Sequence, residues 1–69
     1  MNITARNQIR GTVISVTRGP VSSLVKLDIG GGQHVTASVT TEAVDELGIG
    51  EGKSATAIFK ASSVMLGLE

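Results

Sequence analysis

Two short runs of alternating apolar and polar residues, separated by three consecutive glycines, constrain the fold of this chain most strongly. Residues 25–29 carry an apolar side chain at every second position, and residues 35–39 repeat the pattern beyond the glycines at 30–32. A period of two places all apolar side chains on one face of a β-strand. Glycine supplies the positive φ values that tight hairpin turns require. The sequence therefore predicts a β-hairpin with one buried face.

Three further strands and a helix are predicted around this hairpin. Residues 9–17 are rich in β-branched side chains, and residues 55–60 and 64–68 give two last strands. Between them, Thr40 or Thr41 can cap a short helix that Gly48 ends. Val44 and Leu47 are expected to point from this helix into the core.

This order of elements predicts an all-β fold. Five short strands and one brief helix within residues 1–69 suggest one domain, a small five-stranded barrel of the oligonucleotide/oligosaccharide-binding (OB) type or a near relative. Donating the N-terminal strand to a neighbouring chain would protect the sheet edge equally well.

The short chain also predicts an oligomer. A 69-residue chain buries too little surface to be more than marginally stable alone. With no cysteine and one histidine, His34, disulfides and a structural zinc site are excluded, which leaves association between copies. No apolar run is long enough to cross a bilayer and no signal peptide is evident, so a soluble cytoplasmic protein with no membrane partner is expected.

The N-terminal charges suggest an anion site. The first 27 residues carry four basic side chains and no acid, although the whole chain has a formal net charge of zero. Thr4 offers a hydroxyl, Arg6 a planar fork of donors, and the backbone around Ala5 and Asn7 a concave cluster of N–H groups. Lys60 adds a point charge, so that the two cations balance a dianion. In the alternative interpretation, Arg6 is an ordinary exposed charge and Lys60 protects an edge strand.

Other functions find less support in the sequence. Nucleophilic catalysis lacks a cysteine and a histidine near a serine and an acid, so no enzyme is expected. The three glycines are followed by a strand and lack the Gly-Lys-Ser/Thr ending of a phosphate loop. Nucleic-acid binding would need stacking aromatics, and Phe59, the one aromatic residue, is expected inside or at an interface. A barrel that binds nucleic acid or a protein strand, and a purely structural oligomerising module, remain alternatives.

Three separated blocks of sequence resemble a known family. They are residues 5–8 (ARNQ), residues 46–53 (ELGIGEGK) and residues 57–61 (AIFKA), the last followed by Val64 and Met65. Their order and spacing resemble the molbindins, small cytoplasmic molybdate-binding proteins whose domain also occurs in molybdate-responsive regulators and transporter ATPases. The resemblance covers essentially the whole chain.

The resemblance implies a barrel with a strand exchanged between subunits, assembled into a homohexamer as a trimer of dimers. It implies that Thr4, Ala5 and Arg6 of one chain and Lys60 of its neighbour hold an intact oxyanion, with no other metal and no cofactor. Val21 and Ser22 match a second class of family site near a threefold axis.

The sequence departs from the family in two places: Thr4 replaces a common serine and keeps its hydroxyl, whereas Ala43 replaces a serine ligand and loses one donor. We therefore expect a cytoplasmic store for molybdate or tungstate.

Overall fold

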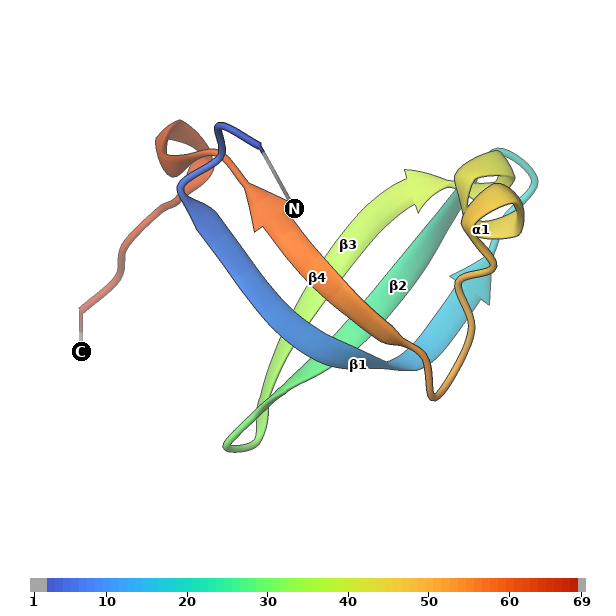
Figure 1. Cartoon of the computed structure of the whole chain (residues 1–69), viewed down its shortest axis with the longest axis horizontal. Coiled ribbons are helices and arrows are strands. Elements are labelled where there is room, and N and C mark those ends of the chain that lie inside the picture. The colour runs from blue at the N-terminus through green and yellow to red at the C-terminus, as the bar shows by residue number, and fades with distance from the viewer. Residues whose placement is uncertain (1–2, 69) are drawn as a thin grey trace.

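The computed structural model describes residues 3–68, and within them it has four strands, one α-helix and one 3-10 helix (Figure 1). In chain order the elements are β1 (Asn7–Arg18), β2 (Ser22–Gly30), β3 (Gln33–Thr40), α1 (Thr41–Leu47), β4 (Ser54–Phe59) and η1 (Ala61–Ser63). All neighbouring strands are antiparallel, in the order β3-β2-β1-β4. The hairpin predicted around the three glycines is confirmed, and so is the all-β fold class.

Strand β1 is the long strand on which the sheet curls. Its first half pairs with β4 and its second half with β2, and Thr12 takes part in both ladders. Two local features let it bend. The register with β2 shifts between Val13 and Ser15, as at a β-bulge, and a Cβ on Gly11 would lie only 2.7 Å from the carbonyl oxygen of Asp28. The sheet therefore curls into a half-barrel.

The core is small and lies inside this curl. Its buried hydrophobic residues within the described chain are Val13, Val25, Leu27 and Val44. The three strand residues all come from positions where alternation places side chains inward. Val44 comes from α1, which covers one end of the half-barrel (Figure 1). So few large side chains give the isolated chain little buried area.

Helix α1 begins and ends as predicted. The Thr40 side chain accepts a hydrogen bond from the Ala43 backbone N–H at 3.1 Å. Gly48 ends the helix in the left-handed conformation at φ 64°, and the Ile49 N–H donates to Val44 O at 3.0 Å. The prediction for Leu47 is wrong, because this side chain is 75% exposed at the end of the last turn.

The expected fifth strand over residues 64–68 does not form within this chain. After η1 the backbone leads away from the sheet, so these residues find no strand of their own chain beside them (Figure 1). Met65 is 92% and Leu66 94% exposed. The chain thus ends, as far as the structure describes it, in an apolar extended segment, which we call the C-terminal tail (residues 64–68).

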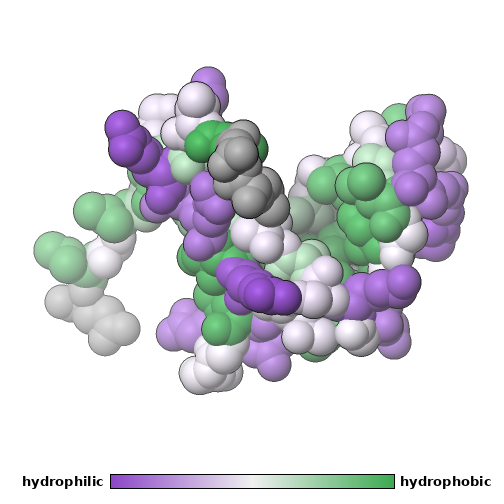
Figure 2. Space-filling view, viewed as in Figure 1, coloured by the Kyte–Doolittle hydropathy of each residue, from purple (hydrophilic) through white to green (hydrophobic). Residues whose placement is uncertain are grey.

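An apolar groove separates the two edge strands β3 and β4. It encloses about 360 Å³ and is lined on one side by Val35 and Ala37 and on the other by Ala57 and Phe59. Figure 2 shows the molecule hollowed between the α1 end and the end that carries the termini, with hydrophobic side chains facing the hollow. Phe59 lies half-buried on this inner side, as alternation predicts. The half-barrel is therefore not closed by its own strands.

Candidate functional site

The two cations singled out in the sequence lie at one end of the sheet. Asn7 and Phe59 form the last pair of the β1–β4 ladder. Arg6 directly precedes Asn7 and Lys60 directly follows Phe59, so both basic residues come one step beyond the same pair. Both are exposed. The structure therefore brings Arg6 and Lys60 to the same end of a single chain.

The segment before β1 adds hydrogen-bond donors to this end. Thr4 is exposed, Ala5 is half-buried, and the Ala5 carbonyl accepts a hydrogen bond from Gln8 Nε2 at 3.3 Å. Among the hydrogen bonds within residues 3–68, none uses the backbone N–H of Ala5 or Arg6 as donor. These N–H groups are available to a ligand. We call Thr4, Ala5, Arg6, Asn7 and Lys60 the terminal site.

The terminal site carries positive charge that no carboxylate in the described part of the chain neutralises. Within residues 3–68 the one ion pair joins Arg18 Nη2 to Asp45 Oδ1 at 2.7 Å, between β1 and α1. Arg6 and Lys60 belong to no such pair there. Two like charges at one end of a sheet attract an anion.

The residues matched to a second class of site lie at the other end of the molecule. Val21 lies in the turn between β1 and β2 and Ser22 is the first residue of β2, both beside α1, whereas Thr4, Arg6 and Lys60 lie at the other end of the sheet, where β1 begins and β4 ends (Figure 1). Val21 is 72% exposed, and no hydrogen bond within residues 3–68 uses its backbone N–H as donor. We call Val21 and Ser22 the turn site; one chain does not bring it together with the terminal site.

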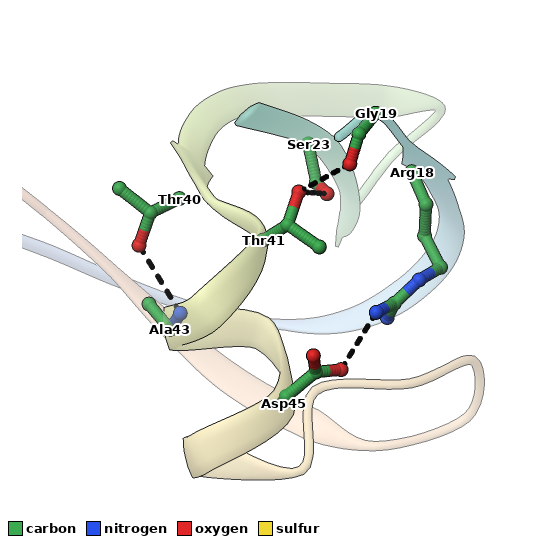
Figure 3. A network of polar contacts seen from close by, with 7 residues as sticks. All are labelled: Arg18, Gly19, Ser23, Thr40, Thr41, Ala43 and Asp45. Carbon is green, nitrogen blue, oxygen red and sulfur yellow. Dashed lines mark hydrogen bonds and ion pairs between the residues drawn. The ribbon is translucent and has the colours of Figure 1, made fainter. Parts of the chain in front are cut away.

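A network of hydroxyl groups next to this turn was not predicted. Thr41 Oγ1 donates to the carbonyl oxygen of Gly19 at 2.7 Å and lies 2.7 Å from Ser23 Oγ (Figure 3). Ser23 is only 1% exposed, the one fully buried polar residue of the described chain. The sequence held a signal for it, because position 23 continues the inward-facing series of Val25 and Leu27 with a polar residue.

Other chemistry finds no comparable arrangement. Within residues 3–68 no three side chains of His, Cys, Asp or Glu gather closely enough to hold a metal ion. His34 is exposed on β3, opposite Asp28 on β2. The groove between β3 and β4 is apolar and would strip water from an ion without replacing its hydrogen bonds. No helix in the described chain is long and apolar enough to span a membrane.

The chain matches the TOBE domain model over residues 3–66. It is 49% identical over 69 residues to a probable molybdenum-pterin-binding protein of Haemophilus influenzae, with each chain covered completely. Its structure superposes on MopII from Clostridium pasteurianum with a TM-score of 0.90 at 39% identity, covering 97% of this chain and all of the other. The molybdate-bound structure of the cytoplasmic molybdate-binding protein ModG matches with a TM-score of 0.94 at 45% identity; this chain, covered completely, spans 49% of ModG.

These matches agree with the architecture in several respects. They extend over nearly all of the described residues, and the solved structures share the curled sheet with one short helix. The family is one of binding proteins and not of enzymes. The chain therefore belongs to the TOBE-domain family, among the molybdenum-pterin-binding (Mop) proteins, which confirms its resemblance to the molbindins.

Proposed function

We propose that this protein binds molybdate, or tungstate, reversibly at subunit interfaces of a homohexamer and so stores the oxyanion in the cytoplasm. Its relatives include proteins described as molybdenum-pterin-binding and molybdate-binding. In this proposal residues 1–69 act as one oxyanion-binding domain, with no cofactor and without nucleic acid or membrane as partner.

The observation that carries the proposal is the composition of the terminal site. Arg6 and Lys60 lie one step beyond the same β-ladder pair, in a chain whose described carboxylates neutralise neither of them. Their combined charge of about two matches a dianion. The unused N–H groups of Ala5 and Arg6 and the hydroxyl of Thr4 add the neutral donors that an oxyanion needs on its remaining oxygens.

Capture in this way makes and breaks no covalent bond. A tetrahedral oxyanion that is fully deprotonated only accepts hydrogen bonds, and every group of the terminal site is able to donate. The side-chain amide of Asn7, which belongs to the ladder opposite Phe59, supplies a further donor. Exclusion of water at a subunit interface would strengthen all of these contacts. Sulfate and phosphate, which are smaller tetrahedral ions than molybdate, would be discriminated by cavity size.

Assembly would complete the site. Because Arg6 and Lys60 lie at the same end of the chain, joining two chains through this end in a twofold contact brings two copies of each cation together. Lys60 of one chain then reaches the Arg6 of the other, as the resemblance implies. Ala43 lies in the first turn of α1 and supplies no hydroxyl, so we expect weaker binding than in relatives with serine there.

The exposed C-terminal tail supports an exchange of strands. Met65, Leu66 and Leu68 are each more than 90% exposed in the single chain. The groove between β3 and β4 is apolar and is bordered by two strand edges. We propose that the tail of one chain adds as the fifth strand to the half-barrel of its partner, and that three such dimers form the hexamer.

The turn site would bind further oxyanions near the threefold axis of this hexamer. Its donors are backbone N–H groups of Val21 and Ser22, and no charged side chain belongs to it. We therefore expect it to bind an oxyanion more weakly than the terminal site does, since a hydrogen bond from a charged donor such as Arg6 or Lys60 to an anion is stronger than one from a neutral backbone N–H.

Calorimetric titration with molybdate, tungstate, sulfate and phosphate, combined with light scattering for the mass in solution, tests the proposal. We expect a hexamer that binds the first two ions and not the others. A hexamer without heat for molybdate and tungstate would favour the structural oligomerising module instead. Salt-dependent binding of single-stranded oligonucleotides would favour a nucleic-acid module, against which the half-buried position of Phe59 argues.

A further inference from the structure

Thr41 binds the carbonyl groups at both ends of the turn between β1 and β2. Its hydroxyl donates to Gly19 O at 2.7 Å, and its backbone N–H donates to Val21 O at 2.8 Å. A threonine hydroxyl has one hydrogen. Because Gly19 O can only accept, Ser23 is the donor in the 2.7 Å contact between Ser23 Oγ and Thr41 Oγ1 (Figure 3). The network thus runs from Ser23 through Thr41 to the turn.

These bonds decide which polar groups the turn presents to solvent. No peptide bond in the described residues is cis, and in a trans peptide unit the N–H and C=O point in opposite directions. With Val21 C=O directed at Thr41, the Ser22 N–H points away from Thr41. Pro20 has no N–H, so its peptide unit with Gly19 carries only a carbonyl, which the Thr41 hydroxyl holds on the α1 side. The Ser22 N–H therefore lies on the side of the turn that faces away from Thr41, and an anion that binds it must approach from that side.

The turn is also closed tightly. A Cβ on Gly19 would lie only 2.5 Å from the Ser22 carbonyl oxygen, which is too close for a side chain. The two ends of the turn can therefore lie this close together only because position 19 is a glycine. Thr41 therefore acts on a compact segment with little freedom to present its N–H groups in another way.

We infer that Thr41, supported by Ser23, is a positioning residue for the turn site: it holds the two carbonyls back so that the backbone donors of Val21 and Ser22 face an oxyanion. This inference rests on the proposed function, because it concerns how one of the proposed sites is held. Packing alone does not require the two hydroxyls. Ser23 is 1% exposed, and burying hydroxyl groups costs free energy that an apolar side chain of the same size avoids.

Molybdate titration of full-length variants tests the inference. The experiment is done in a background with both Arg6→Ala and Lys60→Ala, where the terminal site has lost both charges and the remaining binding reports on the turn site. Thr41→Val keeps the shape of the side chain and removes its hydroxyl. We expect Thr41→Val to weaken turn-site binding by about tenfold or more. In metal sites, removing a hydrogen bond that orients a binding residue typically lowers the affinity by about 10- to 100-fold. Thr41→Ser keeps the hydroxyl and should restore binding.

Thr40→Val is the matched control. It removes the hydroxyl of the preceding residue, which bonds to the Ala43 N–H and to nothing in the turn. This variant should lose helix stability and keep turn-site affinity. Equal turn-site affinity in Thr40→Val and Thr41→Val would overturn the inference. If both bind as the wild type does, the Thr41 hydroxyl is not needed. If both bind more weakly, destabilisation of α1 explains the loss.

A second variant covers the case in which Thr41→Val does not fold. Ser23→Ala removes the donor to Thr41 and leaves the bond from Thr41 to Gly19 O in place. A weaker turn site in Ser23→Ala supports the inference, and wild-type affinity overturns it. If the wild type binds molybdate but the background with both Arg6→Ala and Lys60→Ala binds none, the turn site does not exist and only this inference fails. If the wild type binds none, the proposed function fails with it.

Discussion

Arg6 and Lys60 extend from the same end of the β1–β4 ladder, each one residue beyond the pair Asn7 and Phe59. Two like charges in this arrangement repel one another weakly in water. A bound dianion removes the repulsion and adds charge-assisted hydrogen bonds. The same relationship thus explains why an oxyanion should both bind here and stabilise the protein.

Removing either charge should therefore weaken molybdate binding at the terminal site. Loss of one hydrogen bond to a charged group costs about 1.5–3 kcal/mol, which corresponds to an affinity roughly ten- to a hundredfold lower. Calorimetric titration of Arg6→Ala and Lys60→Ala measures the change. Arg10→Ala, on the same strand, and Lys53→Ala, in the turn before β4, remove the same charges away from the site. If these controls weaken binding equally, overall charge and not the terminal site is responsible.

Molybdate should raise the melting temperature of the wild type and hardly that of Arg6→Ala. A ligand that binds only the folded state stabilises it by about 2.7 kcal/mol at a concentration of 100 times its Kd. For a domain of this size, 1 kcal/mol corresponds to a shift of roughly 4–8 °C. Thermal denaturation at fixed protein concentration, with and without molybdate, gives the measurement. A shift of the same size in both proteins would remove Arg6 from the site.

The close approach of Gly11 to β2 predicts that Gly11→Ala is destabilising. A Cβ there would lie 2.7 Å from Asp28 O and 3.1 Å from Ile29 Cγ2. Because the nearest atom is backbone, relief requires β1 and β2 to move apart, at a cost of about 1–3 kcal/mol. Gly50→Ala is the matched control, since its Cβ would meet nothing within 4 Å. Urea denaturation should show a lower midpoint only for Gly11→Ala; equal midpoints would contradict the proposed crowding.

The ion pair between Arg18 and Asp45 should contribute little. Its atoms are 2.7 Å apart, but the two side chains remain 51% and 62% exposed. Exposed pairs contribute about 0–1 kcal/mol after screening by water and salt. A double-mutant cycle with Arg18→Met and Asp45→Asn should therefore give a coupling energy below about 1 kcal/mol. A larger coupling would mean that this contact, and not the hydroxyl network of Thr41, holds the turn to α1.

Local patterns in the sequence predicted most of the fold, whereas the site residues stay predictions. Alternation and glycine placement gave the hairpin, and Thr40 and Gly48 marked the helix, because these features depend on neighbouring residues. The expected burial of Leu47 was wrong, and the fifth strand does not form within the single chain, because both depend on what lies beside them in space. The placement of Arg6 and Lys60 at the same end of the sheet follows from the register of β1 with β4. That register is set by the whole sheet and not by neighbouring residues.

Removing the C-terminal tail should abolish assembly while the half-barrel still folds. The buried core draws on Val13, Val25, Leu27 and Val44, none of which belongs to the tail, whereas Met65 and Leu66 are almost fully exposed in the single chain. A chain that ends at residue 63 should therefore keep its β-sheet circular dichroism and lower its mass in light scattering from hexamer to monomer. Because the proposed terminal site needs cations from two chains, its molybdate affinity should fall as well.

Leu66→Asp is the subtler form of the same experiment. It keeps the length of the tail and places a charge on a side chain that we expect to enter the apolar groove of a partner. Burying an unpaired carboxylate is costly, so this variant should dissociate, whereas Leu47→Asp, at the 75% exposed last position of α1, should remain assembled. If Leu66→Asp and the truncated chain both stay hexameric, the tail is not the exchanged strand and another surface joins the chains.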